Sequence, residues 1–518
     1  MAETVSTVET SSESKLPGGW SPKTGFGRWL DNYFGISSRG SSILKELIGG
    51  LVIFLAMFYI LPLNAGMLSS NWAGGALALG QPNVKEIGDV TYILLYGDNW
   101  ATVEEVRAGV FAATAISAAV TTIFMGFYGK LPVGLASGLG LNSLIAFNVM
   151  LGMGWNFAQA MCLVMVDGVL FLIVSITPLR GWIVRHIPKS LKFAISAGIG
   201  FFICFIGFQN IGIIRNSDAT LVTLGDFRSL PVLIGLLGIV LVLALSALPQ
   251  KTKALFWVNK FAVIIAIVVM AILCGSLGTA GVDGFEPFYN DAYHISSVGN
   301  FGKIFGAAFF GFDVFAQPMA YAFTFSLLFV DFFDTTGTLV GVEAGAGMVD
   351  EQGRITVNDR PAMIVDAAGT VFGSICGTTT VTSFVESTTG VAAGARTGLA
   401  AVVTGLLFAL SLLIYPVLSA FSCNSVTGLA LIYVGVCMFK NLERLEWKDW
   451  IAVASGFITV IVMCVAYSIS DGIAWGFITY TAMTLCAGRF KKDDIAVAAC
   501  SVAFLAIYIV KYATHIVA

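Results

Sequence analysis

Two aspartates, Asp331 and Asp334, interrupt a long apolar stretch of this 518-residue sequence. Because they are three residues apart, they would lie on one face of a helix. A carboxylate at membrane depth costs free energy unless it is paired or faces water, so it marks function by default. We therefore predict that both residues contact a polar substrate and carry the proton of a proton-coupled transport cycle. The alternative for each is a structural role, as a helix cap or as the partner of a neighbouring group. Asp167 also lies in an apolar run, and its sequence context suggests no particular role.

Glu386 and Asn142 are the next candidates. A carboxylate accepts hydrogen bonds from the N–H groups of a heterocycle, a protonated carboxyl group also donates, and the carboxamide of Asn142 does both. Phe384 lies two residues before Glu386 and offers a face on which a flat ring can stack. The alternatives are a hydrogen bond between helices for Asn142 and simple packing for Phe384. Gly140, Thr335 and Ser387 complete the predicted substrate site, and Glu386 joins Asp331 and Asp334 as a predicted proton-coupling residue.

The segments around Asn142 and Glu386 are unlike lipid-facing helices. Residues 131–150 contain Pro132 and glycines at 134, 138 and 140, and residues 377–394 are rich in Thr, Ser and Gly. Each is the third apolar segment of its half of the chain. Interrupted segments at matching positions in two halves are typical of an inverted repeat with its binding site at the membrane midplane. The alternative is an uneven distribution of glycine, a residue that is common in membrane helices.

Composition indicates a membrane protein. Only 11% of the residues are Asp, Glu, Lys or Arg and 57% are hydrophobic, whereas about 25% of the residues of a soluble domain are charged. Apolar runs of about 20 residues can cross about 30 Å of hydrocarbon as helices. We therefore expect an all-α polytopic membrane protein with seven plus seven segments, and a further apolar stretch at 494–511 that either crosses the membrane or lies along it. The predicted segments are 47–70, 106–129, 131–150, 155–178, 191–213, 229–249 and 255–278, and then 319–342, 361–378, 379–392, 397–418, 425–440, 450–469 and 471–487.

Lys and Arg residues cluster in alternate loops, and cytoplasmic loops are enriched in these residues. The basic clusters fall at 180–192, 251–253, 440–448 and 489–492, whereas the intervening loops at 86–105 and 283–291 are acidic. This alternation predicts a cytoplasmic N-terminus. The first 44 residues are expected to form a disordered or interfacial tail, because they are polar at the start and carry aromatic residues at 26–34.

The sequence also argues against several classes of function. A net charge of −3 is unfavourable for a nucleic-acid partner. The nine cysteines include no CxxC pair and only three histidines are present, so we expect neither a metal site nor a disulfide framework. The sequence has no Gly-Lys-Ser/Thr loop and no HExxH motif, so we expect no enzyme, no ATP-driven pump within this chain and no cofactor besides the coupling proton. A passive channel or facilitator lined by the same acids remains an alternative.

Three stretches resemble one known family. Phe329-Val-Asp-Phe-Phe-Asp-Thr-Thr-Gly-Thr-Leu-Val-Gly341 closely resembles the eighth-span motif of the adenine/guanine/hypoxanthine permeases, a branch of the nucleobase–ascorbate transporter superfamily. Residues 377–398 resemble the tenth segment of that family, and residues 132–142 its third. The resemblance implies a seven-plus-seven inverted repeat with a core and a gate domain, and substrate bound between the two broken segments. It also implies a multi-pass protein of the cell membrane that imports purine bases with protons by an elevator-like movement. Related proteins are often homodimers, so a homodimer is the oligomeric state that the resemblance implies.

The resemblance further implies roles and domain boundaries. Asn142, Asp331, Asp334 and Glu386 match polar positions that matter in the family, and Phe384 matches an aromatic position in related uracil carriers. The signature Gln-x-Glu/Pro-x-Asn-x-Gly of xanthine, urate and ascorbate carriers is absent around Glu386, which favours adenine, guanine or hypoxanthine. Uracil or xanthine is the alternative substrate. The implied domains are a tail at 1–44, a core at 45–180 and 301–420, a gate at 181–300 and 421–490, and an extra C-terminal segment at 491–518.

Overall fold

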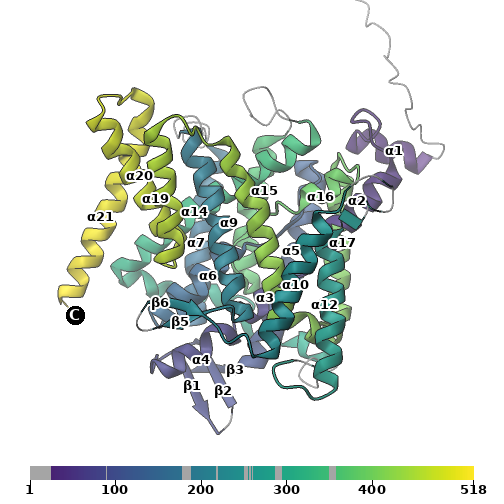
Figure 1. Ribbon diagram of the computed structural model, residues 1–518, viewed down its shortest axis with the longest axis horizontal. Helices are drawn as coiled ribbons and strands as arrows, with labels where there is room; N and C mark the ends of the chain where they lie inside the picture. Colours follow the sequence, from purple (N-terminus) through teal and green to yellow (C-terminus); the bar gives the residue numbers. More distant parts are fainter. Residues whose placement is uncertain are drawn as a thin grey trace, which may run out of the picture.

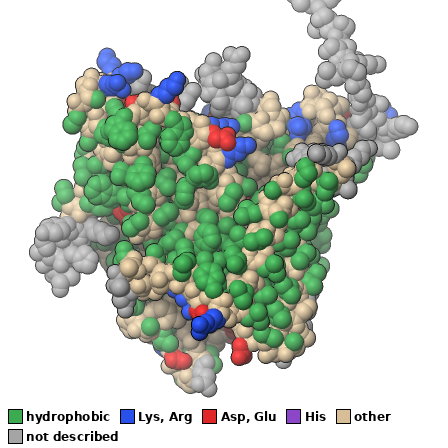
Figure 2. Space-filling model, viewed as in Figure 1, with side chains coloured by type: hydrophobic (Ala, Val, Ile, Leu, Met, Phe, Trp, Pro, Cys, Tyr) green, Lys and Arg blue, Asp and Glu red, His purple; other side chains and the backbone are tan. Residues whose placement is uncertain are grey.

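A computed structural model describes residues 25–517 apart from 89, 178–187, 218–219, 250–251, 253–254, 256–257, 260, 286, 288–294 and 349–357. Most of its helices run side by side between two opposite ends of the molecule (Figure 1). Most of the charged side chains gather at these two ends, and hydrophobic side chains cover the surface between the ends (Figure 2). An apolar band between two polar ends is the surface that a bilayer-spanning protein requires.

In the described part of the chain, eight helices are long and apolar enough to cross a membrane. This result confirms the predicted polytopic, predominantly helical class. The eight are Ile43–Ala78, Val103–Gly129, Phe157–Ile176, Ser190–Ile211, Ala262–Thr279, Pro318–Ala346, Gly398–Pro416 and Asn424–Arg444, and shorter apolar helices cover Leu139–Gly152, Leu230–Ser246, Trp450–Val465 and Ile495–Ala506.

The first half of the chain forms the helices α1 to α12. A short helix α1 (Gly25–Phe34) precedes the first predicted span, which is divided into three consecutive helices and extends further than predicted, to Ala78. These three are α2 (Ile43–Met57), α3 (Ile60–Met67) and α4 (Ser70–Ala78). The remaining long helices of this half are α5 (Val103–Phe124), α7 (Phe157–Ile176), α9 (Lys189–Ile211), α10 (Leu230–Ser246) and α12 (Ala262–Thr279).

The second half supplies α14 (Pro318–Ala346), α15 (Asp359–Cys376), α17 (Gly398–Leu410), α18 (Asn424–Phe439), α19 (Trp450–Val465) and α20 (Ile469–Cys486). The apolar stretch at 494–511 belongs to one further helix, α21 (Ile495–Val517), which packs against α20 and α14. The ring of Phe504 lies 5.4–6.3 Å from the rings of Phe325, Phe329 and Phe477, so aromatic contacts hold α21 against these two helices.

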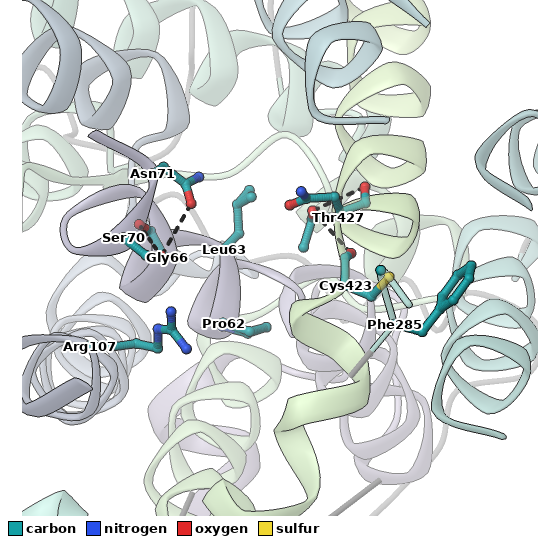
Figure 3. A pocket seen from close by; sticks show the side chains of 11 residues that line it. Pro62, Leu63, Gly66, Ser70, Asn71, Arg107, Phe285, Cys423 and Thr427 are labelled. Carbon is teal, nitrogen blue, oxygen red and sulfur yellow. Dashed lines mark hydrogen bonds between the residues drawn. The ribbon is translucent and has the colours of Figure 1, made fainter. Parts of the chain in front are cut away.

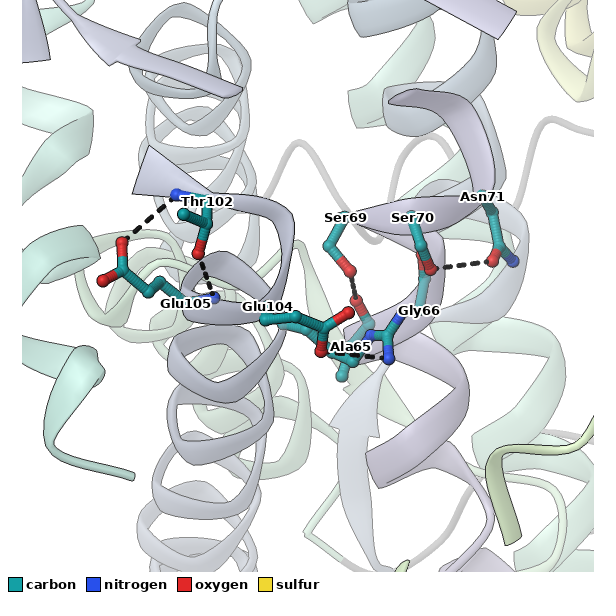
Figure 4. A network of polar contacts seen from close by, with 9 residues as sticks. Ala65, Gly66, Ser69, Ser70, Asn71, Thr102, Glu104 and Glu105 are labelled. Carbon is teal, nitrogen blue, oxygen red and sulfur yellow. Dashed lines mark hydrogen bonds and ion pairs between the residues drawn. The ribbon is translucent and has the colours of Figure 1, made fainter. Parts of the chain in front are cut away.

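Short strands add to the helical plan at places where the sequence analysis expects loops. Strands β1 (Val84–Ile87), β2 (Val90–Tyr96) and β3 (Asn99–Thr102) form an antiparallel sheet at one end of the helices (Figure 1). β5 (Ile214–Ser217) and β6 (Leu221–Leu224) form a hairpin. The sheet leads directly into α5, where the Thr102 hydroxyl accepts from Glu105 N (3.2 Å) and the Glu105 carboxylate accepts from Thr102 N (3.1 Å), as Figure 4 shows. This reciprocal capping box fixes the start of the helix.

The long helices pack in two groups. In the first, α5 contacts α3, α15 and α17, α17 contacts α2, and α7 contacts α14 and α15. In the second, α9 contacts α18 and α19, α10 and α12 contact α18, and α19 contacts α20. Contacts between the groups include those of α14 with α9 and α20. Helices from both halves of the sequence are therefore interleaved in each group.

Candidate functional site

The two predicted broken segments meet in the interior as a pair of strands. β4 (Leu135–Ser137) and β7 (Val381–Ser383) are antiparallel, with Leu135 opposite Ser383 and Ser137 opposite Val381. The pairing continues on both sides, because Phe384 N donates to Gly134 O (3.0 Å) and Gly138 N donates to Thr380 O (2.9 Å). Each strand leads into a short helix, α6 (Leu139–Ser143) or α16 (Ser387–Ala392). The breaks at the third position of each half are thus confirmed.

Glycines permit the close approach of the two segments. A Cβ atom on Gly138 would lie 2.6 Å from Thr382 Cγ2 of β7, whereas one on Gly134 would lie 2.5 Å from Met57 Sδ of α2. The Gly134 N–H group also donates to Ser387 Oγ (3.0 Å), which joins the entry of one segment to the helix of the other. Gly138 therefore permits the close approach of the two strands, and Gly134 permits the packing of α2 on the first of them.

Hydroxyl groups satisfy much of the polar interior around the strands. Ser137 Oγ lies 2.8 Å from Thr378 Oγ1 and 2.9 Å from Thr379 Oγ1. Asn64 Nδ2 donates to Thr114 Oγ1 and to Thr378 Oγ1, both at 2.7 Å. Asn64 lies on α3, so this network ties the first span to the second broken segment. Buried backbone and hydroxyl groups are stable here because they bond to one another.

Asn142 lies in α6 and is fully buried. Its Oδ1 atom accepts a hydrogen bond from Thr379 Oγ1, whereas its Nδ2 atom has no hydrogen-bond partner among the described residues. Gly140, two residues earlier, faces the second helix group, because a Cβ atom there would lie 2.6 Å from Ile469 Cδ1 and 3.8 Å from Ile199 Cγ2. The start of α6 therefore lies at the boundary between the two groups, with an unused amide donor close by.

The predicted acids of α14 lie beside the strands. Asp331 Oδ2 accepts from Thr370 Oγ1 of α15 at 3.1 Å, and Asp331 Oδ1 has no partner in the described structure. Asp334 Oδ2 accepts from Thr382 Oγ1 of β7 at 3.4 Å, a long hydrogen bond. Asp331 is fully buried, whereas Asp334 is partly exposed. Asp331 thus lies deep in the helix packing, and Asp334, three residues later on α14, lies against β7.

Asp366 of α15 is an acid at the strands that is absent from the predicted site. One of its oxygens accepts from Thr335 Oγ1 (2.7 Å), and the other accepts from Ser383 N (2.8 Å) and Ser383 Oγ (2.6 Å). Three donors stabilise the ionised carboxylate and hold the end of β7 against α14 and α15. The sequence could have identified Asp366, because it is the single charged residue of the apolar segment 361–378. The hydroxyl group of Thr335, predicted to contact substrate, is directed to Asp366.

Glu386 lies at the start of α16, only 9% exposed. Its Oε1 atom accepts a 2.6 Å hydrogen bond from the hydroxyl group of Tyr59, a second residue absent from the predicted site. Tyr433 and Cys437 of α18 lie near Glu386. Phe384 is 7% exposed and directly follows β7. The glutamate is therefore held by the first helix group and faces a helix of the second.

A separate cavity of about 350 Å³ lies between α3, α4 and α5 on one side and the start of α18 on the other (Figure 3). Pro62, Leu63, Arg107 and Cys423 are among its lining residues, and none of the eight predicted site residues lines it. Polar contacts on its wall include the ion pair between Arg107 and Glu104 (3.2 Å), drawn in Figure 4. The broken segments and this cavity are thus two distinct places in the fold.

The fold and the paired breaks define the class of the protein, an inverted-repeat membrane transporter. The structure is similar to the transmembrane domain of a cyanobacterial bicarbonate transporter, BicA, with a TM-score of 0.51 and 15% identity over 83% of this chain and 96% of that one. It is also similar to murine Solute Carrier 26 family member A9 in the inward-facing state, with a TM-score of 0.53 and 13% identity over 92% of this chain and 74% of that one. At these identities the likeness concerns the fold.

Sequence comparison identifies the family. Residues 90–475 match the permease family. The chain is 36% identical to the guanine/hypoxanthine permease PbuG of Bacillus subtilis (strain 168), over 89% of this chain and 96% of that protein. It is 32% identical to the adenine permease AdeQ of Escherichia coli (strain K12), over 90% of this chain and 93% of that protein. The chain belongs to this permease family, which confirms the predicted membership and the prediction of a transporter rather than an enzyme.

Proposed function

We propose that this chain is a secondary active transporter of the cell membrane that imports the purine bases adenine, guanine or hypoxanthine together with protons. The observation that carries the proposal is the pairing of β4 with β7, which brings Asn142 and Glu386 to the two ends of one short sheet. Relatives that cover most of this chain are named as adenine and as guanine/hypoxanthine permeases. Family and geometry together support a purine as the substrate.

Substrate recognition in this proposal uses both halves of the repeat. A purine presents ring N–H groups and ring nitrogen acceptors along its edges. Glu386 accepts from the N–H groups, and the free Nδ2 group of Asn142 donates to a ring nitrogen or to an exocyclic oxygen. Asp334 adds a partly exposed acceptor, and Phe384 supplies a ring face. Gly140 leaves room for Ile469 of the second helix group to pack beside Asn142. Thr335 and Ser387 position this set through Asp366 and Gly134.

Proton coupling in this proposal uses Asp331, Asp334 and Glu386. Each is an acid inside the helix packing, and the described structure pairs none of them with Lys or Arg. An acid in such surroundings favours a bound proton until a donor or water approaches it. Substrate binding at Asp334 and Glu386 supplies donors, so the loading of proton and substrate becomes linked.

Translocation in this proposal is a movement of one helix group against the other. The group around α5 and α7 corresponds to the implied core at 45–180 and 301–420, and the group around α9 and α18 to the implied gate at 181–300 and 421–490. Gly140 packs near Ile199 and Ile469 at the boundary between the two helix groups. Glu386 lies near Tyr433 at the same boundary. An elevator step that slides the core along this boundary would carry the site across the membrane. The N-terminus is cytoplasmic in the proposed orientation.

Uptake of radiolabelled adenine, guanine and hypoxanthine tests the proposal in cells that lack their own purine carriers. We expect saturable accumulation of at least one base, and loss of this accumulation when a protonophore is added. Failure to take up any purine would overturn the substrate, and uptake of uracil or xanthine instead would identify the alternative. Accumulation that persists with the protonophore would overturn the proton coupling. Equilibration without accumulation would identify a passive facilitator.

A further inference from the structure

Asp167 lies at the centre of a helix and is fully buried. It is the eleventh residue of α7, which runs from Phe157 to Ile176, so it is about 15 Å from either helix end at about 1.5 Å per residue. Its exposed fraction is 0%, and neither carboxylate oxygen has a hydrogen-bond partner among the described residues. A structural aspartate at a helix end or in an ion pair would have partners for its oxygens. Asp167 requires a different explanation.

Three contacts bring the turn of α7 that contains Asp167 close to Asp331. Gly168, the next residue, packs so closely on α15 that a Cβ atom there would lie 2.9 Å from Thr370 Cγ2. The hydroxyl group of that same Thr370 donates to Asp331 Oδ2 at 3.1 Å. One turn beyond Asp167, the ring of Phe171 lies 6.1 Å from the ring of Phe332, which directly follows Asp331. The two acids therefore lie on helices that meet at one junction of α7, α14 and α15.

The other charged groups near α7 are engaged elsewhere. On α15, Asp366 is bonded to Thr335 and Ser383, and on α14, Asp334 is bonded to Thr382. Asp313 accepts from Gln159 near the beginning of α7 (2.7 Å), and Arg360 donates to Ile176 O at its end. Within the described ranges, neither Asp167 nor Asp331 forms an ion pair. Among the described residues, the junction thus holds two acids with three carboxylate oxygens that have no partner, and no ion pair compensates them.

Two ionised carboxylates in this position would repel each other in an apolar interior that leaves them poorly solvated. One bound proton removes this repulsion. We propose that Asp167 and Asp331 together form a site that binds one proton. The role of this proton as the coupling proton rests on the proposed function. The existence of the Asp167–Asp331 site does not depend on the proposed function. The site is distinct from Glu386 and Asp334, which we propose contact the substrate.

Infrared difference spectroscopy of the purified full-length protein tests the site without any transport. A protonated carboxylic acid gives a carbonyl band that shifts in D₂O and disappears when the acid ionises. We expect this band in the wild-type protein at neutral pH, a shift of the band in both Asp167→Asn and Asp331→Asn because the remaining acid loses its charged neighbour, and an unshifted band in the control Asp313→Asn, an exposed aspartate beside the same helix. An unshifted band in Asp167→Asn would overturn the proposal. Removal of the band by Na⁺ at constant pH would overturn it in favour of a sodium site.

Two further measurements keep the test decisive. If Asp167→Asn does not fold, Asp167→Glu retains a carboxyl group, and we expect it to shift the band; an unchanged band would overturn the site. In proteoliposomes, we expect Asp167→Asn to retain counterflow exchange of purine and to lose accumulation driven by a pH gradient. Retained accumulation would show that this proton is not the coupling proton. If the wild-type protein itself fails to accumulate purine, the proposed function fails, whereas the infrared result still decides the proton site.

Discussion

The hydroxyl group of Tyr59 donates a 2.6 Å hydrogen bond to Glu386 Oε1, although 327 positions separate the two residues in the sequence. Tyr59 lies at the break between α2 and α3, and Glu386 lies where β7 gives way to α16. Interruptions in two different segments thus position one carboxylate, at the boundary with α18. A substrate that bonds to Glu386 therefore encounters a side chain whose orientation is already fixed.

Tyr59→Phe removes this donor while the ring remains in place. A hydrogen bond to a charged group contributes about 1.5–3 kcal/mol, so we expect roughly a tenfold or larger rise in the KM for purine uptake. Initial uptake rates over a range of substrate concentrations give this value. Tyr321→Phe is the matched control, because Tyr321 is 62% exposed and lies away from the strands. Equal KM values for the wild-type and Tyr59→Phe proteins would show that the bond has no role in binding.

Glu386→Gln retains the shape of the side chain and removes its charge. We expect purine uptake to fall to background while the protein still reaches the membrane, because an amide replaces one carboxylate acceptor with a donor. Uptake normalised to the amount of protein in the membrane fraction provides the measurement. Glu443→Gln, at an exposed position, should transport normally. Near-normal uptake by Glu386→Gln would remove this residue from the site.

Asp366→Asn should act on stability as well as on transport. The carboxylate accepts three hydrogen bonds from Thr335 and Ser383, and the amide leaves at least one buried donor without an acceptor, at a cost of about 1–3 kcal/mol. We expect a lower Tm in detergent and weak purine uptake. Asp98→Asn, in the exposed turn between β2 and β3, is the control, and its Tm should stay close to that of the wild type. A Tm for Asp366→Asn equal to that of the control would contradict the structural role of Asp366.

Gly138→Ala tests the approach of the two strands. The added methyl group would lie 2.6 Å from Thr382 Cγ2, so the strands must separate or Thr382 must move, at a cost of about 1–3 kcal/mol. We expect a lower Tm and reduced binding of purine to the purified protein. Gly74→Ala provides the comparison, because no atom lies within 4 Å of its added Cβ in the helix α4. There the substitution should be neutral or slightly stabilising, since alanine favours a helix over glycine. The same Tm for both variants would show that close packing at Gly138 is unimportant.

Much of the architecture was predictable because hydrophobicity is a property of each segment alone. Runs of apolar residues located the membrane segments, and glycine-rich interruptions located both breaks, at 131–150 and 377–394. Asp331 and Asp334 were identified because a charge in such a run is rare. The three-stranded sheet at 84–102 was not predicted, since its strands are short and lie in a loop between two stronger helical signals.

The sequence by itself determined that the chain is a polytopic transporter, which of its segments are broken and which family it belongs to. Only the tertiary structure decided what the buried polar groups touch. It paired β4 with β7, directed Thr335 to Asp366 and Tyr59 to Glu386, and packed α7, which carries Asp167, against α14, which carries Asp331. The physical reason is the sequence separation of the residues involved. Burial in a bilayer depends on the local composition of about 20 residues. A buried hydrogen bond depends on atoms that the fold brings together from positions hundreds of residues apart.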